Sequence, residues 1–209
     1  MKKNMLSDHI IVVGITGGIG SGKSVVSRLF CMKNIPVYDA DTEAKRLMNV
    51  QVSLREQLCN LLDEDLYVQG ELDKARLAKW MFADNARVLA VNKIVHGALA
   101  QDFIQWVNIQ YQLGLPIVAI ESAILFESGF NTLVDLVILV DAPKELRLQR
   151  AMMRDSVTRE QVEVRMNKQM DDDARRELVD KIILCDDIHP VIPQVSNLVT
   201  EIQQYFTRK

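Results

Sequence analysis

The residues best suited to chemistry lie near the start of the chain, where four glycines surround a lysine and a serine. Residues 17–24 read Gly-Gly-Ile-Gly-Ser-Gly-Lys-Ser and match the pattern G-x-x-x-x-G-K-[ST]. Glycines let a loop curl so that successive N–H groups converge on phosphate oxygens, and a following helix adds the positive end of its dipole. We therefore expect Lys23 to reach the β and γ phosphates of a nucleotide and the Ser24 hydroxyl to bind Mg²⁺.

The same motif defines the nucleotide contacts that we expect. The alternative, a glycine-rich turn without a ligand, needs a chance match, which we put below about one in a hundred for a chain of this length. An apolar run precedes the motif and a helical pattern follows it, which is the context that a phosphate-binding loop requires. The predicted contacts are Gly17, Gly20, Ser21, Gly22, Lys23, Ser24 and Val25.

Carboxylates follow two of the apolar runs of the chain. Asp39 and Asp41 end the second run, and in extended geometry residues i and i+2 lie on one side, here toward the carboxyl edge of a sheet. A carboxylate there can accept the proton of an attacking hydroxyl or hold Mg²⁺ through water. The alternative is that Asp41 caps a helix starting near Thr42. Glu121 resembles a Walker-B acid or is a solvent-facing charge. Glu127, near the same edge, is a candidate substrate contact, with a solvent-facing charge as the alternative, and Asp41 is a candidate substrate contact as well.

An arginine-rich segment and a lone histidine complete the candidate site. Among the arginines, Arg147, Arg150 and Arg154 have i, i+3 and i+7 spacing and share one helix face, from which a guanidinium can stabilise a transferring phosphoryl group. A solvated helix face interleaved with acids is the alternative for each of them. His96 is a candidate substrate contact, and the neighbouring Gly97 indicates a kink or a close approach in its helix.

These side chains require a particular set of elements to position them. Five apolar runs rich in β-branched residues predict buried parallel strands separated by helices, which is an α/β fold. The runs are Ile10–Ile15, Ile35–Tyr38, Pro116–Ile120, Leu133–Val140 and the weaker Ile182–Cys185. The carboxyl ends of such strands form one edge, where ligands bind.

The uneven spacing of the runs predicts three parts. Residues 8–41, 116–142 and 179–209 form a phosphate-binding core, residues 42–115 a helical insertion that binds the acceptor, and residues 143–178 a lid. In the insertion, a helix capped by Asp84 buries apolar residues at steps of three and four. In the lid, Thr158-Arg159-Glu160-Gln161 has the form of a capping box, which starts a second helix after a break near Asp155. A closing amphipathic helix follows Pro193 and includes Phe206.

Composition excludes several classes of protein. The 209 residues are 48% hydrophobic and 25% charged with a net charge of −3, so neither a fibrous chain nor a nonspecific nucleic-acid binder is expected. Three cysteines in no metal-binding spacing predict no zinc site and a reducing, cytoplasmic setting. No apolar stretch approaches the ~18 residues of a membrane span. The oligomeric state is not predicted.

Together these motifs resemble the dephospho-CoA kinase family of nucleoside-monophosphate-kinase-like P-loop enzymes. The residues that carry the resemblance are Thr16–Ser24, Val37–Asp41, Leu125-Phe126-Glu127, Arg150 and Arg154-Asp155. The resemblance implies a P-loop core with a helical CoA-binding domain and a lid. It also implies the reaction, in which ATP phosphorylates the ribose 3′-hydroxyl of dephospho-CoA to give CoA and ADP.

The resemblance also implies roles for single residues. Asp41 corresponds to the second Asp of the family's D-A-D motif, the expected base, while Lys23 holds ATP and Arg150 and Arg154 come from the lid. His96-Gly97 replaces the family's His-Pro pair, and Asp186 lies near the place of an Asn in the family. Another small-molecule or nucleotide kinase of this fold stays an alternative. A GTP-dependent switch is a weaker one, because the guanine-reading N-K-x-D motif is not met.

Overall fold

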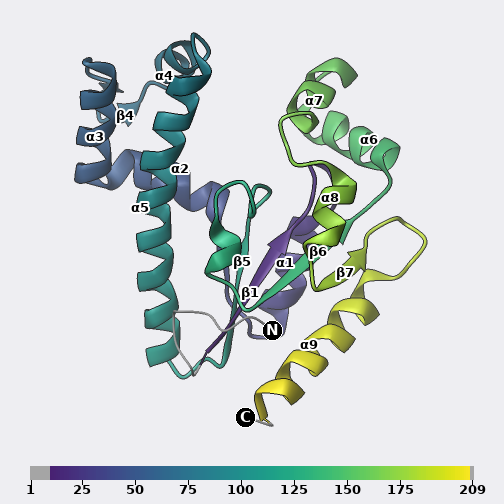
Figure 1. Ribbon diagram of the computed structural model, residues 1–209. Helices are drawn as coiled ribbons and strands as arrows, with labels where there is room; N and C mark the ends of the chain where they lie inside the picture. Colours follow the sequence, from purple (N-terminus) through teal and green to yellow (C-terminus); the bar gives the residue numbers. More distant parts are fainter. Residues whose placement is uncertain (1–9, 208–209) are drawn as a thin grey trace. The chain divides into compact units, whose positions relative to one another are not determined.

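The structure is a computed structural model that describes residues 10–207, with side chains from 10 to 204 (Figure 1). Residues 8–9 and 208–209 of the predicted core and the side chain of Phe206 therefore lie outside the described residues. The chain divides into two compact units, Met1–Tyr38 with Val107–Lys209, and Asp39–Trp106.

The first unit is built on a five-stranded sheet with the order β2-β5-β1-β6-β7. Its strands are β1 (Ile11–Thr16), β2 (Val37–Asp39), β5 (Ile117–Glu121), β6 (Leu136–Asp141) and β7 (Lys181–Leu184). The pairs β1–β5, β1–β6 and β6–β7 are parallel, as the apolar runs predict, and all six residues of β1 are buried. The α/β class is confirmed. The central position of β1 directs the phosphate-binding loop to the middle of the carboxyl edge.

One predicted strand is too long at its start. β6 begins at Leu136, whereas the apolar run begins at Leu133. A short 3-10 helix, η1 (Phe130–Thr132), takes up the chain before it, and the Leu133 N–H donates to the Phe130 carbonyl at 2.9 Å. Because that bond closes a turn, Val134 is buried and Leu133 half-buried by the turn rather than by strand pairing. Apolar content alone does not separate these two kinds of burial.

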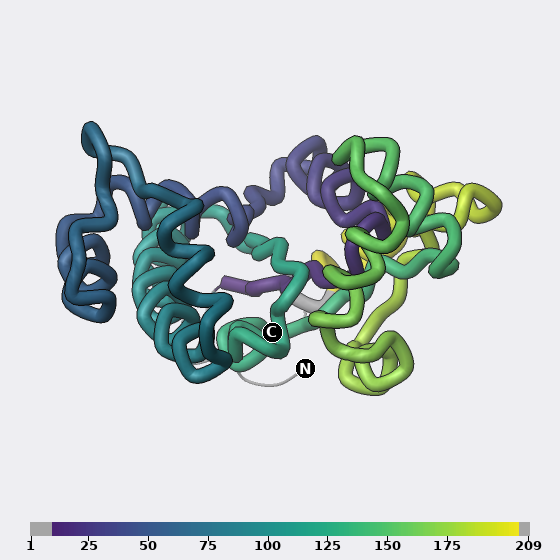
Figure 2. The backbone as a smooth tube through the Cα atoms, turned by 90° about the horizontal axis from the view of Figure 1, so that it is seen from above, coloured from purple at the N-terminus to yellow at the C-terminus, as the bar shows by residue number. Residues whose placement is uncertain are grey.

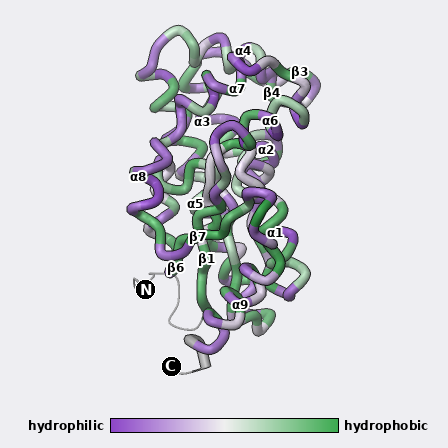
Figure 3. Tube along the Cα trace, turned by 90° about the vertical axis from the view of Figure 1, so that its right-hand side faces the viewer, coloured by the Kyte–Doolittle hydropathy of each residue, from purple (hydrophilic) through white to green (hydrophobic). Residues whose placement is uncertain are grey.

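Two helices cover one face of the sheet. Helix α1 (Lys23–Met32) and helix α9 (Val191–Thr207) contact each other and share one apolar core with the strands. Ile11, Val13 and Ile15 of β1 point into this core, as the period of two along a strand requires. Figure 3 shows β1 in hydrophobic green and α8 (Asp172–Glu177) in hydrophilic purple. The rigid packing of α1 on β1 fixes the loop between them.

Helix α9 begins two residues before the predicted start at Pro193. A proline fits in the first turn of a helix, where its missing N–H has no intrahelical acceptor to lose. The predicted apolar face is confirmed, because Val195, Leu198, Val199 and Ile202 are buried. No helix among residues 10–207 is long and apolar enough to cross a membrane.

The second unit consists of helices around a small hairpin. Its elements are α2 (Ala40–Val50), α3 (Val52–Leu62), β3 (Tyr67–Val68), β4 (Glu71–Leu72), α4 (Lys74–Met81) and most of α5 (Asn85–Gln112). In Figure 2 these segments run from blue to teal. The purely helical prediction for this segment is wrong at the hairpin. Gln69 and Gly70 take φ values of 52° and 88°, the conformation of a tight hairpin turn.

Helix α5 has the predicted cap at Asp84, but it lacks the kink or close approach predicted at Gly97. Asp84 precedes the helix and accepts a hydrogen bond from the Ala86 N–H at 2.9 Å. Val91, Val95, Leu99 and Phe103 form its buried face. The helix runs unbroken through Gly97, and a Cβ there would meet open space. The expected kink or close approach is therefore wrong, and the residue costs helix propensity without a packing reason.

Three helices make up the arginine-rich segment. Helix α6 (Lys144–Asp155) ends at Ser156 in the left-handed conformation, and α7 (Arg159–Met166) begins with the predicted capping box. Thr158 accepts from the Gln161 N–H, and the Gln161 side chain accepts from the Thr158 N–H at 3.0 Å. Leu148, Ala151 and Val162 join the two helices in a small core. A third short helix, α8, was not predicted.

Candidate active site

The phosphate-binding loop has a backbone that only glycine can provide. Gly20 and Gly22 have φ values of 77° and 99°, in the left-handed region that disfavours side chains. A Cβ at Gly20 would collide with the backbone of Arg147, and one at Gly22 would lie 2.6 Å from the Cys185 Sγ. The loop is thus packed between α6 and the end of β7. Its closely fitted backbone directs N–H groups and the start of α1 to one place, which suits an anion.

Lys23 and Ser24 occupy the first turn of α1. The Lys23 ammonium donates to the carbonyl oxygens of Gly17 at 2.9 Å and Gly18 at 3.2 Å, so the side chain folds over the loop. Ser24 is exposed, with its hydroxyl at the helix N-terminus. The predicted loop residues Gly17 to Val25 therefore lie together in the loop after β1 and the first turn of α1.

Glu121 is held next to this helix. The Ser27 hydroxyl, which is buried, donates to the Glu121 carboxylate at 2.6 Å. Ser27 lies three residues after Ser24 and so on the same face of α1. Among the described residues no group of three or more His, Cys, Asp or Glu side chains is placed to hold a metal ion. The Ser24 hydroxyl and the Glu121 carboxylate are oxygen donors of the kind that suits Mg²⁺, because this ion favours a few protein ligands together with substrate phosphates.

The two aspartates after β2 differ from the prediction. The strand ends at Asp39, and Asp41 lies in the first turn of α2, so the pair does not share one side of an extended strand. Asp39 is the N-cap, accepting from the Thr42 N–H at 3.1 Å and from its hydroxyl at 2.8 Å. The capping role offered as the alternative for Asp41 therefore belongs to Asp39. Asp41 is exposed at the positive end of the helix.

The arginines of the segment 143–178 have separate partners. Arg150 donates to the Cys185 carbonyl at 2.8 Å and to Asp187 at 2.6 Å, which ties α6 to the loop after β7. Arg154 pairs with Asp155 and is 61% exposed. Arg150 is therefore fixed to another segment and Arg154 faces solvent, although the two predicted residues share a helix face. Arg150 lies beside Cys185, which also borders the phosphate-binding loop.

The sequence predicts neither the burial of Arg147, which it places on the candidate helix face, nor that of Arg175 in the same arginine-rich segment. Arg147 and Arg175 are 4% and 1% exposed, and both pair with Asp172. Arg147 packs against Gly18, where a Cβ would collide with its guanidinium. Burial lowers the pKa of Arg175 from its ordinary value, because desolvation outweighs the nearby Glu127 and Asp172 carboxylates. No local pattern distinguishes these arginines from exposed ones.

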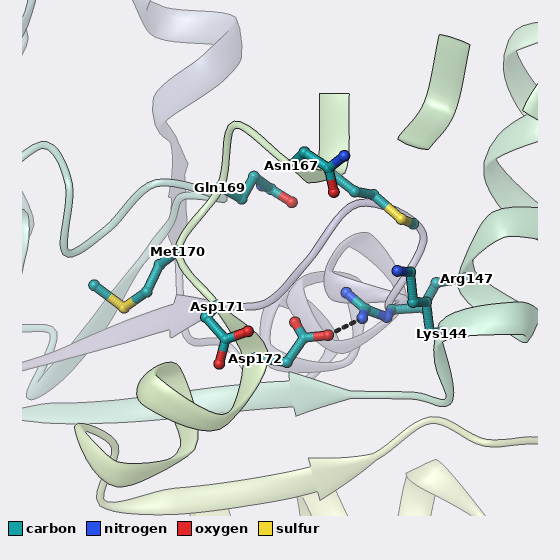
Figure 4. A pocket seen from close by; sticks show the side chains of 8 residues that line it. Lys144, Arg147, Asn167, Gln169, Met170, Asp171 and Asp172 are labelled. Atoms are coloured by element: carbon teal, nitrogen blue, oxygen red, sulfur yellow. Dashed lines mark hydrogen bonds and ion pairs between the residues drawn. The ribbon is translucent and has the colours of Figure 1, made fainter. Parts of the chain in front are cut away.

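A cavity of about 360 Å³ lies beside this pair (Figure 4). Figure 4 shows the Arg147–Asp172 ion pair on one side and Gln169 across from it. The lining includes both charges and amides, so the cavity is polar. Its residues are Lys144, Arg147, Met166, Asn167, Gln169, Met170, Asp171 and Asp172.

Of the three predicted substrate contacts, Asp41 is described above, and Glu127 and His96 lie in different units. Glu127, in the first unit, accepts a hydrogen bond from the Met170 N–H at 2.8 Å, so its carboxylate holds the segment between α7 and α8. His96, in the second unit, is half-buried on α5. Burial lowers the pKa of His96 below its usual value of 6.5, so the imidazole is mainly neutral at pH 7.

Comparisons with known proteins identify one family. The family model described as dephospho-CoA kinase matches residues 11–189. The dephospho-CoA kinase of Bacteroides fragilis is 41% identical over 194 residues, which cover 93% of this chain and 94% of the relative. The match to this relative runs through the phosphate-binding loop, the insertion and the lid segment.

Two solved structures resemble the fold. A crystal structure from Thermus thermophilus, titled TT1252, has a TM-score of 0.79 at 30% identity and covers 95% of this chain and 98% of its own. The dephospho-CoA kinase from Campylobacter jejuni has a TM-score of 0.67 at 21% identity, covering 92% of this chain and 97% of its own. At that identity the second likeness supports the fold alone.

Proposed function

This chain belongs to the dephospho-CoA kinase family, and from that premise we propose how its own residues carry out the reaction. The protein is a kinase that uses ATP and dephospho-CoA and catalyses the last step of coenzyme A synthesis. The 3′-hydroxyl oxygen attacks the γ-phosphorus, and the bond from that phosphorus to the β-phosphate oxygen breaks. CoA and ADP are the products.

The phosphate-binding loop carries this proposal. Its left-handed glycines and the start of α1 direct N–H groups to the β and γ phosphates, where they stabilise negative charge. Lys23 exchanges the carbonyl oxygens of Gly17 and Gly18 for phosphate oxygens when ATP binds. The loop therefore holds ATP with its γ-phosphoryl at the carboxyl edge of the sheet.

The metal ion is the finer part of the proposal. The chemistry that Mg²⁺ would supply here, if bound, is positive charge that offsets the negative charge developing during the transfer. The Ser24 hydroxyl would bind the ion directly, and Glu121 would contact a bound water. The Ser27–Glu121 hydrogen bond supports this assignment, since it holds the carboxylate next to the helix that carries Ser24.

Asp41 is the proposed base for the acceptor hydroxyl. Its carboxylate accepts the 3′-hydroxyl proton as the new P–O bond forms. Its exposed position on the first turn of α2 supports this role, because a substrate can reach it. Asp39 fixes the direction of that turn through Thr42. His96 and Glu127 are proposed contacts of the acceptor.

The remaining proposals concern the lid, the insertion and the cellular location of the protein. Residues 143–178 are proposed to close over ATP, with Arg150 and Arg154 supplying positive charge to the phosphates. The insertion 42–115 is proposed to bind the acceptor. A cytoplasmic location is also proposed, and it is supported by the three cysteines, which are all free in the structure.

A side-by-side assay tests the acceptor. The purified protein is supplied with Mg²⁺ and ATP, and ADP release is measured with dephospho-CoA, AMP or a small hydroxy acid. Dephospho-CoA is expected to give the fastest release and to yield a phosphorylated product of the mass of CoA. If dephospho-CoA releases ADP no faster than buffer, the assignment is wrong. Replacing ATP by GTP tests the switch-protein alternative, which would prefer GTP.

A further inference from the structure

The segment between α7 and α8 reaches the phosphate-binding loop through a glutamine. The Ile19 N–H donates to the Gln169 Oε1 at 3.0 Å, across 150 residues of sequence. The Gln169 Nε2 in turn donates to the Ala123 carbonyl at 3.3 Å, in the loop after β5. One amide group therefore joins the apex of the phosphate-binding loop to the loop after β5.

The position of Gln169 is itself fixed on both sides. Its backbone N–H donates to the Met166 carbonyl at the end of α7 at 3.0 Å. The next residue, Met170, donates its N–H to Glu127 at 2.8 Å and accepts from the buried Arg175 at 2.9 Å. The glutamine is thus held by a frame of directed bonds, and its side chain has little freedom to leave Ile19.

The bond to Ile19 decides how the loop is oriented. Residues 18–21 form a turn closed by the Ser21 N–H and the Gly18 carbonyl at 3.1 Å, with Ile19 at its apex. Holding the Ile19 N–H with an amide oxygen sets the rotation of this turn. The adjoining Gly20 and Gly22, with their left-handed backbones, then direct their own N–H groups. A wrongly rotated turn would direct those groups away from the phosphates.

We propose that Gln169 is a positioning residue for ATP, whose amide bridges Ile19 and Ala123 and holds the phosphate-binding loop in its anion-binding conformation. The inference rests on the proposed function, since it assumes that this loop binds the phosphates of ATP. The ordering of the loop before ATP arrives removes part of the entropy cost of binding. Gln169 acts on affinity for the phosphates and touches no reacting atom.

Two variants of different size test the proposal. Gln169→Met keeps the volume and loses both hydrogen bonds, and Gln169→Ala loses the bonds and the volume. Both are expected to weaken binding of a non-hydrolysable ATP analogue by about tenfold, which is the effect of losing one net hydrogen bond that orders the phosphate-binding loop. The KM for ATP should rise similarly, while kcat at saturating ATP falls less than threefold. Gln149→Leu, on the exposed side of α6, is the matched control.

Three further measurements separate positioning from a general loss of structure. Adenosine, which has no phosphates, should bind both variants as it binds the wild type, and the KM for dephospho-CoA should not change. The midpoint of thermal unfolding is measured for each variant to identify a folding defect. Wild-type affinity of Gln169→Met for the analogue overturns the proposal. A loss confined to Gln169→Ala also overturns it, because packing would then explain the effect.

Failure of the proposed function is recognised separately. Analogue affinity is measured without any acceptor, so it reports on Gln169 whatever the acceptor is. If the wild type binds the analogue but does not phosphorylate dephospho-CoA, the acceptor assignment fails and the glutamine result still stands.

Discussion

The phosphate-binding loop and the start of α2, for which we propose adjoining steps of one reaction, are built in opposite ways. The loop depends on backbone geometry, with left-handed glycines packed against Arg147 and Cys185. The start of α2 depends on exposed carboxylates, with Asp39 as the cap and Asp41 in the first turn. The contrast teaches that this chain binds ATP with a preformed backbone and presents its proposed base on an accessible side chain.

The largest effect is expected from the exposed carboxylate. Asp41→Asn should lower kcat by on the order of 10³, within the usual range for loss of a general base, and leave ATP-analogue affinity unchanged. Steady-state kinetics and equilibrium binding check both parts. Asp63→Asn, which makes the same change at an exposed residue that ends α3, is the matched control. Near-normal turnover of Asp41→Asn would show that Asp41 is not the base and only places a negative charge at the start of α2. The difference drawn between the loop and the start of α2 would then be wrong.

The next effect concerns the loop. Lys23→Ala removes the ammonium that lies over Gly17 and Gly18, and it should lower kcat by roughly 10² and weaken ATP binding together. That joint change would distinguish Lys23 from Asp41, whose loss changes kcat alone. Lys33→Ala, at an exposed position just after α1, is the matched control. An unchanged rate and an unchanged KM for ATP would remove Lys23 from the site.

A smaller effect is expected from Ser27, which is buried and holds Glu121 beside the proposed Mg²⁺ position. Ser27→Ala removes the hydrogen bond to Glu121, and it should raise the Mg²⁺ concentration needed for half-maximal activity by about tenfold, as loss of a supporting ligand contact does. Excess Mg²⁺ should restore most of the rate. Titration of activity with Mg²⁺ measures the shift. A wild-type titration curve would show that Glu121 has no part in metal binding.

The smallest effect concerns pH and the second unit. Burial lowers the pKa of His96 in the folded protein, so the unfolded chain takes up this proton first as pH falls through about 6.5. The contribution of His96 to stability is therefore full above pH 6.5 and is lost below it. Unfolding followed from pH 8 to 5 should show a shallower acid decline for His96→Gln than for the wild type. Parallel curves would contradict the buried position.

The sequence predicts the loop well because its motif is local. Eight consecutive residues specify the turn, the charge and the start of α1, and the apolar runs specify the parallel sheet. The geometry at Asp41 was predicted wrongly, because an apolar run does not show at which residue a strand gives way to a helix. Helix α2 begins after Asp39 because the carboxylate of Asp39 accepts a hydrogen bond from the Thr42 N–H and caps the helix there.

The contacts around the loop were beyond sequence reasoning for a different reason. Gln169 and Ile19 lie 150 residues apart, and neither belongs to a pattern that links them. Likewise, Arg147 and Arg175 look like other lid arginines until burial separates them from the exposed Arg154. Side-chain identity is local information, whereas the partner of a side chain depends on the fold of the whole unit.

The central place of β1 in the sheet also has a consequence for folding. β1 begins at Ile11, but its two neighbours begin at Ile117 and Leu136. Once synthesised, β1 must therefore wait until the chain has reached residue 117 before it can pair with a neighbour. Such nonlocal pairing makes folding slow and leaves apolar strands exposed meanwhile. Nascent chains that end before β6 should thus remain unable to bind ATP, although they already contain the complete phosphate-binding motif.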